Sequence, residues 1–524
     1  MKSSIFYFVA ILIIGGALGL HFAFFHGGYL GYDELEYCKL GSDLADNSFT
    51  HDNLYAYRYA AFVPLSLLYL IFGIDDFANF LYQFLILAYV CWLLLDIVKD
   101  KDKLTQWIGL IVLVFTSMHL LYLEKPMADF AVELGFFMAF IGYYRQRYMT
   151  NFSDRAWRNA TLFITGSILI FLAKETFLVL YPFFLILMLY DLYHRRHLLF
   201  WQRIVSILVG FIILYFSAYH IFMGNALARV DAIFTNRYIS DCTYELQPTS
   251  IVVKRILYVL WVDFIRSGFM IPLIGFGLFF GGKVISNQER FVGLSWIALL
   301  LLANFMTISY TAYVPLCNDP RHFIFILPVG AFFLVQSLSR LSEWKTSGFL
   351  FSVTALMIQL GVSIYFGQEN TYFLYIPLIL AFLTQMIWKQ RIIFTLLFSL
   401  GIGSIYVQNS MYNREANHKG TKELLIKIIE QKDFRHIVVT DGANARIGDF
   451  FNNYQKDKVN FVPFDSLSTI KQDTVSKKWV IINGMTLYLS SQKWEKLPQE
   501  VQTAHEKLPI FFKNRSGTVY MLSK

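Results

Sequence analysis

Three carboxylates stand close together near the start of the chain, in the stretch Tyr32-Asp33-Glu34-Leu35-Glu36-Tyr37. The stretch comes shortly after a long apolar run that covers residues 5–25. A carboxylate in such a place can cap a helix, or it can take up a proton as a general base. Asp33, with Glu36 three residues later, has the form of a capping box. The two interpretations are compatible, because a capping carboxylate can also accept a proton.

Basic side chains next to apolar runs form the second group that could do chemistry. The residues that could bind an anionic group are Arg58, Lys174, Arg237, Arg321 and His322. Arginine suits a phosphate because its planar fork of donors can bind two oxygens at once. Lys174 stands with Glu175 between two apolar runs. Neighbours on a helix point about 100° apart, so these two side chains are expected to pair poorly with each other.

Several candidates also have a purely structural interpretation. Asp129 stands near the end of an apolar run and could be a boundary residue. Arg321 lies in a short turn, Asn318–His322, and could belong to the level of the lipid headgroups. A lone charge inside a bilayer costs roughly 2.5–3.5 kcal/mol on insertion scales. That cost favours a functional role for Lys174.

The composition predicts a membrane protein. Only 16% of the 524 residues are charged and 56% are hydrophobic, whereas soluble proteins carry about 25% charged residues. Apolar runs of about twenty residues recur, which is enough to cross a hydrocarbon core about 30 Å thick. Because unpaired backbone cannot face lipid, we expect a polytopic α-helical membrane protein. The net charge of +8 comes from basic residues in short connections, a pattern of cytoplasmic loops rather than of a nucleic-acid surface.

Placing these basic connections in the cytoplasm predicts about 13 transmembrane helices, with the candidate residues on the outer side. Two outer loops result, 26–76 with the acidic stretch and 224–255. The apolar segment 60–72 is too short to cross and is expected to lie in the outer interface. The predicted spans are 5–25, 77–97, 105–123, 127–144, 159–173, 176–190, 204–222, 256–280, 291–313, 322–338, 347–366, 372–387 and 392–408.

The composition changes towards the end of the chain. We expect residues 1–410 to form the transmembrane domain and residues 411–524 a small α/β domain on the outer face. The alternation of two patterns predicts strands at His436–Thr440, Val459–Val462, Trp479–Ile482, Ile510–Phe512 and Val519–Leu522, and helices at Lys422–Gln431, Ile447–Tyr454 and Ser491–His505.

The order of these motifs resembles the integral-membrane GT-C glycosyltransferases. The nearest branch is glycosyltransferase family 39, with the protein O-mannosyltransferases and the lipid A aminoarabinose transferases. The sequence departs from that pattern at Arg58 and Pro64, where aminoarabinose-transferase relatives often carry Glu-Lys-Pro-Pro, and at His322, where a tyrosine is usual. The resemblance covers roughly residues 1–340, and the matching segments are Tyr32-Asp33-Glu34, Tyr57 to Gly73, Asp129 with its Phe-rich helix, Ala173-Lys174-Glu175-Thr176 with Pro182, and Pro320-Arg321-His322 to Pro328.

The resemblance implies that a sugar moves from a polyprenyl-phosphate donor to a glycan, lipid or protein acceptor on the extracytoplasmic side, with inversion. It implies that Asp33 is the general base and that Glu34 or Asp129 orients the acceptor or the base. The implied ligands of the donor phosphate are Arg58, Lys174, Arg237, Arg321 and His322. A divalent cation is compatible with the carboxylates, but no ligand spacing demands a metal, and we assign no cofactor.

The expected location is a bacterial inner or plasma membrane, as a multi-pass protein whose partners include the bilayer and no nucleic acid. Two other functions stay open. A secondary transporter would show polar or broken sites at mid-span in paired halves. A non-catalytic membrane scaffold with an outer binding domain is the other alternative.

Overall fold

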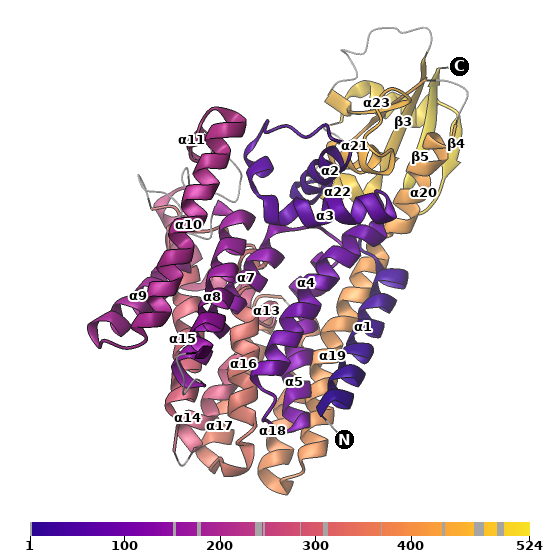
Figure 1. Ribbon diagram of the computed structural model, residues 1–524. Helices are drawn as coiled ribbons and strands as arrows, with labels where there is room; N and C mark the ends of the chain where they lie inside the picture. The colour runs from indigo at the N-terminus through magenta and orange to yellow at the C-terminus, as the bar shows by residue number, and fades with distance from the viewer. Residues whose placement is uncertain are drawn as a thin grey trace.

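The computed structural model describes residues 3–149, 154–175, 180–235, 244, 247–282, 284–307, 313–367, 369–431, 435–465, 476–489 and 497–523. Figure 1 shows a bundle of helices with a small α/β unit at the end away from the N-terminus. The helices of the first half are α1 (Ser3–Phe25), α2 (Asp33–Ala45), η1 (Leu54–Tyr57), α3 (Tyr59–Phe72), α4 (Asp76–Ile97), α5 (Lys103–Val114), α6 (Ser117–Tyr122), α7 (Ala128–Tyr148), α8 (Asp154–Ala173), α9 (Tyr181–Tyr193), α10 (Leu198–Met223) and α11 (Ala228–Thr235).

The second half of the bundle contains more broken helices. Its elements are α12 (Thr249–Lys254), η3 (Arg255–Val259), α13 (Leu260–Arg266), η4 (Ile271–Phe276), α14 (Gly277–Gly281), α15 (Asn287–Phe305), η5 (Pro320–Phe323), α16 (Ile326–Leu338), η6 (Leu341–Glu343), α17 (Thr346–Tyr365), η7 (Glu369–Thr371), α18 (Tyr372–Trp388) and α19 (Arg391–Ala416).

Among the described residues, six helices are long and apolar enough to cross a membrane: α1, α4, α8, α10, α17 and α19. A seventh candidate is the pair Thr249–Arg266 and Ile271–Gly281, which is bent by 95° at its break. The predicted count of about 13 is therefore not confirmed. Several predicted spans are short or interrupted helices; the span 105–123, for example, is divided into α5 and α6 by a break at residues 115–116.

The apolar segment 60–72 forms a helix, as predicted, and this helix is α3. Its 14 residues make it one of the shorter apolar helices, below the length that a crossing needs. In Figure 1, α2 and α3 lie at the end of the bundle that carries the α/β unit.

Close packing of α7 against α8 brings together two of the candidate residues. A Cβ atom added to Gly135 of α7 would lie 2.6 Å from the carbonyl oxygen of Gly166 in α8. The two backbones can approach this closely because glycine has no side chain, a common device between helices in membranes. Asp129 at the start of α7 and Lys174 just after α8 consequently lie at the same end of this helix pair.

The C-terminal part contains the predicted strands in one mixed sheet of order β2-β1-β3-β5-β4. Strand β1 pairs in parallel with both β2 and β3, and β5 is antiparallel to β3 and β4. The α/β fold of this part is thus as expected. Its elements are α20 (His418–Ile429), β1 (Arg435–Thr440), α21 (Gly442–Phe451), β2 (Val459–Pro463), β3 (Ser476–Asn483), α22 (Gly484–Leu489), α23 (Gln499–Lys507), β4 (Ile510–Lys513) and β5 (Gly517–Ser523).

Helix α21 packs on the loop that leads to the acidic stretch. Gly31 has φ +86°, and a Cβ atom there would lie 2.6 Å from the Cα atom of Ala443 in α21. The Arg446 guanidinium donates to the Gly31 carbonyl at 3.4 Å, and the Tyr454 hydroxyl donates to the Leu35 carbonyl at 3.2 Å. The α/β unit therefore braces the backbone on both sides of Asp33.

Replacing Gly31 by alanine is expected to destabilise the protein more than replacing Gly73. Both glycines have positive φ, +86° and +79°, so each alanine variant carries a backbone strain of about 1–3 kcal/mol. Gly31 alone adds a clash with α21, because no described atom lies within 4 Å of a Cβ at Gly73. Thermal unfolding and limited proteolysis of the α/β unit measure the difference. Equal losses in the two variants would mean that the contact with α21 contributes nothing.

Candidate active site at the end of the bundle next to the α/β unit

Asp33 is the first residue of α2, and its carboxylate points away from the helix backbone towards other elements. Its Oδ1 accepts a hydrogen bond from the Tyr55 hydroxyl at 2.9 Å, and its Oδ2 lies 3.3 Å from Nη2 of Arg321. The predicted capping box is wrong, because the N-cap of α2 is Tyr32, without a side-chain cap. Glu36 instead accepts from the Asn53 amide at 2.6 Å.

The surroundings of Asp33 favour its ionised form. Burial acts to raise the pKa of this carboxyl, but the charges of Arg321 and Lys174 and the Tyr55 hydrogen bond outweigh it. The net result is a pKa below the ordinary value of an aspartate. At neutral pH Asp33 is therefore a carboxylate with a lone pair available for a proton.

A second group of charges surrounds Lys174. Its Nζ donates to Oδ1 of Asp129 at 2.9 Å and lies 3.0 Å from Nδ1 of His322. That ring nitrogen also lies 3.2 Å from Oδ1 of Asp129. Because His322 directly follows Arg321, the Asp33 group and the Lys174 group adjoin through η5. The structure thus brings together five of the eight predicted site residues: Asp33, Asp129, Lys174, Arg321 and His322.

Arg58 occupies a different position from the one expected for a phosphate ligand. Its guanidinium is buried and forms a two-pronged ion pair with Glu175, with Nε donating to Oε2 at 2.9 Å and Nη2 donating to Oε1. Its third nitrogen donates to the Tyr37 hydroxyl at 2.7 Å. The donors of this arginine are thus engaged inside the protein, and phosphate binding by Arg58 stays a prediction that these contacts do not favour.

Glu34 is also placed differently from its predicted role. It is fully buried, and its Oε1 accepts hydrogen bonds from the backbone N–H groups of Leu30, Gly31 and Tyr32 at 2.6, 2.7 and 3.3 Å. Glu34 therefore stabilises the turn that precedes Asp33, and its role in orienting an acceptor or a base stays a prediction. Arg237, the remaining predicted phosphate ligand, lies outside the described residues.

Partners that the sequence analysis did not assign complete the site. Asp319 lies 3.1 Å from Nε of Arg321, and the Tyr122 ring lies 5.8 Å from the centre of its guanidinium. Tyr55 reaches Asp33 from the short helix η1. The sequence carried only a weak signal for these residues, since tyrosines are frequent throughout the chain, with 32 of them.

An apolar cavity of about 370 Å³ lies between α3, α4, α7 and α8. Two residues of its wall are close in the chain to the Lys174 group. Ala131 stands two residues after Asp129, and Leu169 stands five residues before Lys174. The polar group and the apolar cavity are therefore built on the same two helices, α7 and α8. The wall also includes Ala60, Pro64, Leu67 and Tyr82.

Comparison with known proteins identifies the fold. No protein-family model and no curated protein matches the sequence. The structure is similar to crystal structures of ArnT from Cupriavidus metallidurans, in the apo state (TM-score 0.57) and bound to undecaprenyl phosphate (TM-score 0.53). In both cases the sequence identity is 12%, and the match covers 98% of this chain and 97% of ArnT. The expected GT-C type of fold is thereby confirmed.

We expect separate replacement of Arg58 by alanine or of Glu175 by glutamine to lower stability by about 3–5 kcal/mol, because each removes one charge of a buried pair. The combined variant Arg58→Met/Glu175→Leu removes both charges and should recover most of that loss. Thermal unfolding in detergent provides the measurement. The exposed pair of Lys39 with Asp43 supplies the control, since Lys39→Gln should cost less than about 1 kcal/mol. A double variant as unstable as the single ones would contradict this account.

Proposed function

We propose that this protein is a GT-C-type transferase that moves a sugar from a polyprenyl-phosphate donor to an acceptor hydroxyl on the extracytoplasmic face. The observation that carries the proposal is the contact of the Asp33 carboxylate with Arg321, next to the Lys174 group. One ionised carboxylate beside two cationic side chains suits a reaction in which a base and a phosphate ligand act together.

In the proposed reaction Asp33 is the general base. The acceptor oxygen attacks the anomeric carbon of the sugar, and its proton passes to the Asp33 carboxylate. The bond between the anomeric carbon and the phosphate oxygen breaks, so the polyprenyl phosphate leaves with the electron pair. Attack opposite to the leaving group inverts the configuration of the sugar carbon.

Arg321 and Lys174 are the proposed ligands of the donor phosphate. Each is held by a carboxylate in the present arrangement, Arg321 by Asp33 and Lys174 by Asp129. A phosphate that enters between them offers the same charge with more oxygens, so the cations can exchange partners and release Asp33. Growing negative charge on the leaving phosphate is then stabilised where it forms. Asp129 and His322 keep Lys174 in position.

The lipid part of the donor has a suitable place beside these residues. The apolar cavity on α7 and α8 can accept isoprenoid groups, which gain free energy of about 25 cal/mol per Å² of buried apolar surface. ArnT from Cupriavidus metallidurans was crystallised with undecaprenyl phosphate, which supports a lipid of that class for this protein.

The outer location of the site has one independent support in the second half of the chain. Cys317, two residues before Asp319, is disulfide-bonded. Structural disulfides persist in oxidising compartments outside the cytoplasm. This agrees with the charge distribution of the loops, which assigns the same face to the outside.

Replacing Asp33 by asparagine is expected to lower the rate of sugar transfer by about 10²- to 10⁴-fold, the usual contribution of a positioned base. The measurement is transfer of labelled sugar from a polyprenyl-phosphate donor by the purified protein in lipid. Asp46→Asn, on an exposed residue next to the end of the same helix, is the matched control and should retain full activity. Full turnover by Asp33→Asn would refute the base assignment. If the protein took up a solute and transferred no sugar, the alternative function of a secondary transporter would be favoured.

Arg321→Gln is expected to move the acidic limb of the kcat/KM profile to higher pH. Asp33 must be ionised to act as a base, so activity falls as the pH drops through its pKa. The charge of Arg321 helps to hold that pKa below its ordinary value, and its removal raises the pKa. Arg340→Gln, which removes an arginine paired with Glu289 outside this site, should leave the limb unchanged. If the acidic limb of Arg321→Gln did not move, the ionisation of Asp33 would not be the cause of that limb.

A further inference from the structure

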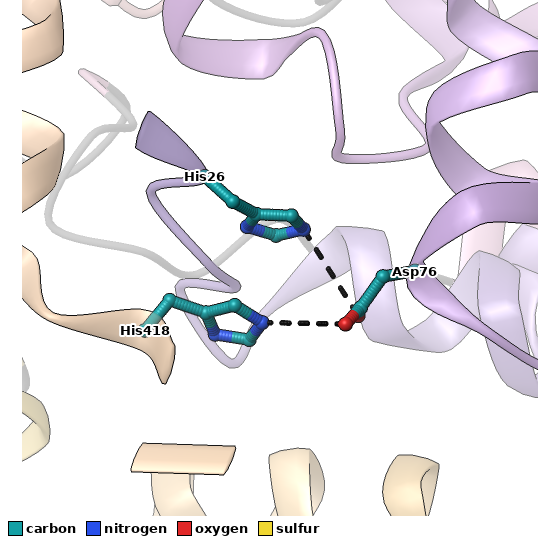
Figure 2. A group of neighbouring side chains, drawn as sticks. All are labelled: His26, Asp76 and His418. Atoms are coloured by element: carbon teal, nitrogen blue, oxygen red, sulfur yellow. Dashed lines mark ion pairs between the residues drawn. The ribbon is translucent and has the colours of Figure 1, made fainter. Parts of the chain in front are cut away.

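A separate cluster of three side chains lies at the junction of the bundle and the α/β unit. His26 directly follows α1, Asp76 begins α4 and His418 begins α20 (Figure 2). Nε2 of His26 lies 4.0 Å from Oδ1 of Asp76, and Nε2 of His418 lies 3.6 Å from Oδ2. One ligand atom from each residue can be chosen so that all three lie within 4.8 Å of one another.

The two imidazoles point their Nε2 atoms at Asp76, and both atoms are buried without a hydrogen-bond partner among the described residues. A buried polar nitrogen that lacks a partner is unfavourable and calls for an explanation. The rings lie nearly parallel, with centroids 4.2 Å apart. Gly28 permits this approach, since a Cβ atom there would lie 2.4 Å from Nδ1 of His418.

We propose that His26, Asp76 and His418 bind a divalent transition-metal ion of the Zn²⁺ class. Two imidazole nitrogens and one carboxylate oxygen are a common ligand set for such an ion, with a water as the fourth ligand. Zinc ligands lie about 2.0–2.2 Å from the metal, which places them roughly 3.3 Å from one another. The present ligand atoms need to close by about 1.5 Å at most, through a tilt of the rings.

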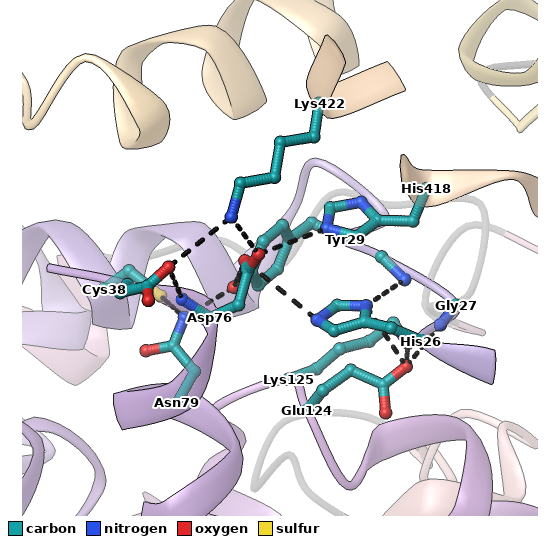
Figure 3. A network of polar contacts seen from close by, with 12 residues as sticks. His26, Gly27, Tyr29, Cys38, Asp76, Asn79, Glu124, Lys125, His418 and Lys422 are labelled. Carbon is teal, nitrogen blue, oxygen red and sulfur yellow. Dashed lines mark hydrogen bonds and ion pairs between the residues drawn. The ribbon is translucent and has the colours of Figure 1, made fainter. Parts of the chain in front are cut away.

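The second shell around the cluster fits a metal site. The Tyr29 hydroxyl donates to Oδ1 of Asp76 at 2.8 Å, and Nδ1 of His26 lies 3.8 Å from Oε1 of Glu124 (Figure 3). The backbone N–H of Gly27 holds that oxygen of Glu124 at 2.7 Å. A carboxylate behind a histidine ligand fixes the ring with its proton on the far nitrogen. In this structure the Gly28 N–H donates to Nδ1 of His26 at 2.8 Å, so the ring proton lies on Nε2. Metal binding at Nε2 requires that this proton move to Nδ1, that the Gly28 N–H give up its contact with Nδ1, and that Nδ1 then donate to Glu124.

Lys422 stands where it can replace the metal charge. Its Nζ lies 2.7 Å from Oδ2 of Asp76 and 3.5 Å from Oδ1 of Asp75, and a third of its side chain is exposed. This ammonium group neutralises Asp76. When an ion binds, Lys422 can transfer to Asp75, which is more exposed.

The three ligands lie at positions where a metal would stabilise the architecture of the outer end. His26 and Asp76 are the first and last residues of the loop 26–76, which contains Asp33. His418 begins the first helix after the bundle. One ion would close this loop and fasten it to the α/β unit, and clips that close long loops remove the most chain entropy. The inference does not depend on the transferase reaction.

The test uses the untagged full-length protein in detergent. It is treated with a chelator, loaded with ZnCl₂ alone, passed through gel filtration and analysed for zinc by mass spectrometry. We expect one zinc per chain in the wild type and in His220→Ala, which removes an exposed histidine elsewhere, and almost none in His26→Ala or His418→Ala. Glu124→Gln should weaken Zn²⁺ binding by about 10- to 100-fold, as replacement of a second-shell carboxylate does.

A measurement on the wild type alone guards against variants that fail to fold. Loading with Co²⁺ should produce the visible absorption of a tetrahedral site, and zinc X-ray absorption should detect two imidazole ligands. Zinc should also raise the midpoint of thermal unfolding in the wild type. A wild-type protein that keeps no zinc after gel filtration would overturn the proposal. Unchanged zinc content in a folded His26→Ala/His418→Ala variant would overturn it equally.

Discussion

The buried ion pair between Arg58 and Glu175 is the interaction on which the geometry of the candidate site depends. It joins the segment between α1 and α4 to the break after α8, across 117 residues of sequence. The two side chains are only 3% and 6% exposed, so neither charge can be satisfied by water and each requires the other. Since Glu175 faces Arg58, its neighbour Lys174 is directed to the opposite side, towards Asp129 and His322. The pair thus holds Glu175 in a buried contact, while the neighbouring Lys174 is left to face the candidate site.

Three carboxylates and two cationic side chains meet in this group, so each cation is already paired with a carboxylate. Arg321 touches Asp33 and Asp319, while Lys174 touches Asp129. A neutral ligand would have to break these contacts without compensation, whereas an anion replaces the carboxylates one for one. This arrangement agrees with the proposed exchange of a carboxylate for the donor phosphate. It also keeps Asp33 ionised before that group arrives.

The sequence predicted the existence and type of most elements, because apolar runs and alternating patterns are local properties. It also placed Asp33 and Arg321 on one face, since loop charges report orientation even across 288 residues. The observed partners of Arg58 and Glu34 could not be predicted in this way. Whether an arginine meets phosphate or Glu175 is decided by the packing of α3 beside α8, which no local pattern records. The capping box failed for the same reason, because Tyr55 and Arg321 compete for the carboxylate.

In the α/β unit, the end of the sheet where a nucleotide could bind is covered by another part of the chain. This agrees with the proposal of a lipid-linked donor. In sheets with parallel strands, ligands such as nucleotides bind outside the carboxyl ends of the strands. Here β1 ends at Thr440, and the side chain of Asp441 caps α21 by accepting a hydrogen bond from the backbone N–H of Asn444 at 2.9 Å. Ala443 in the first turn of that helix packs against Gly31. The end of the sheet that could hold a nucleotide sugar is instead covered by the loop of Asp33, which agrees with the proposed donor reaching Asp33 from the bundle.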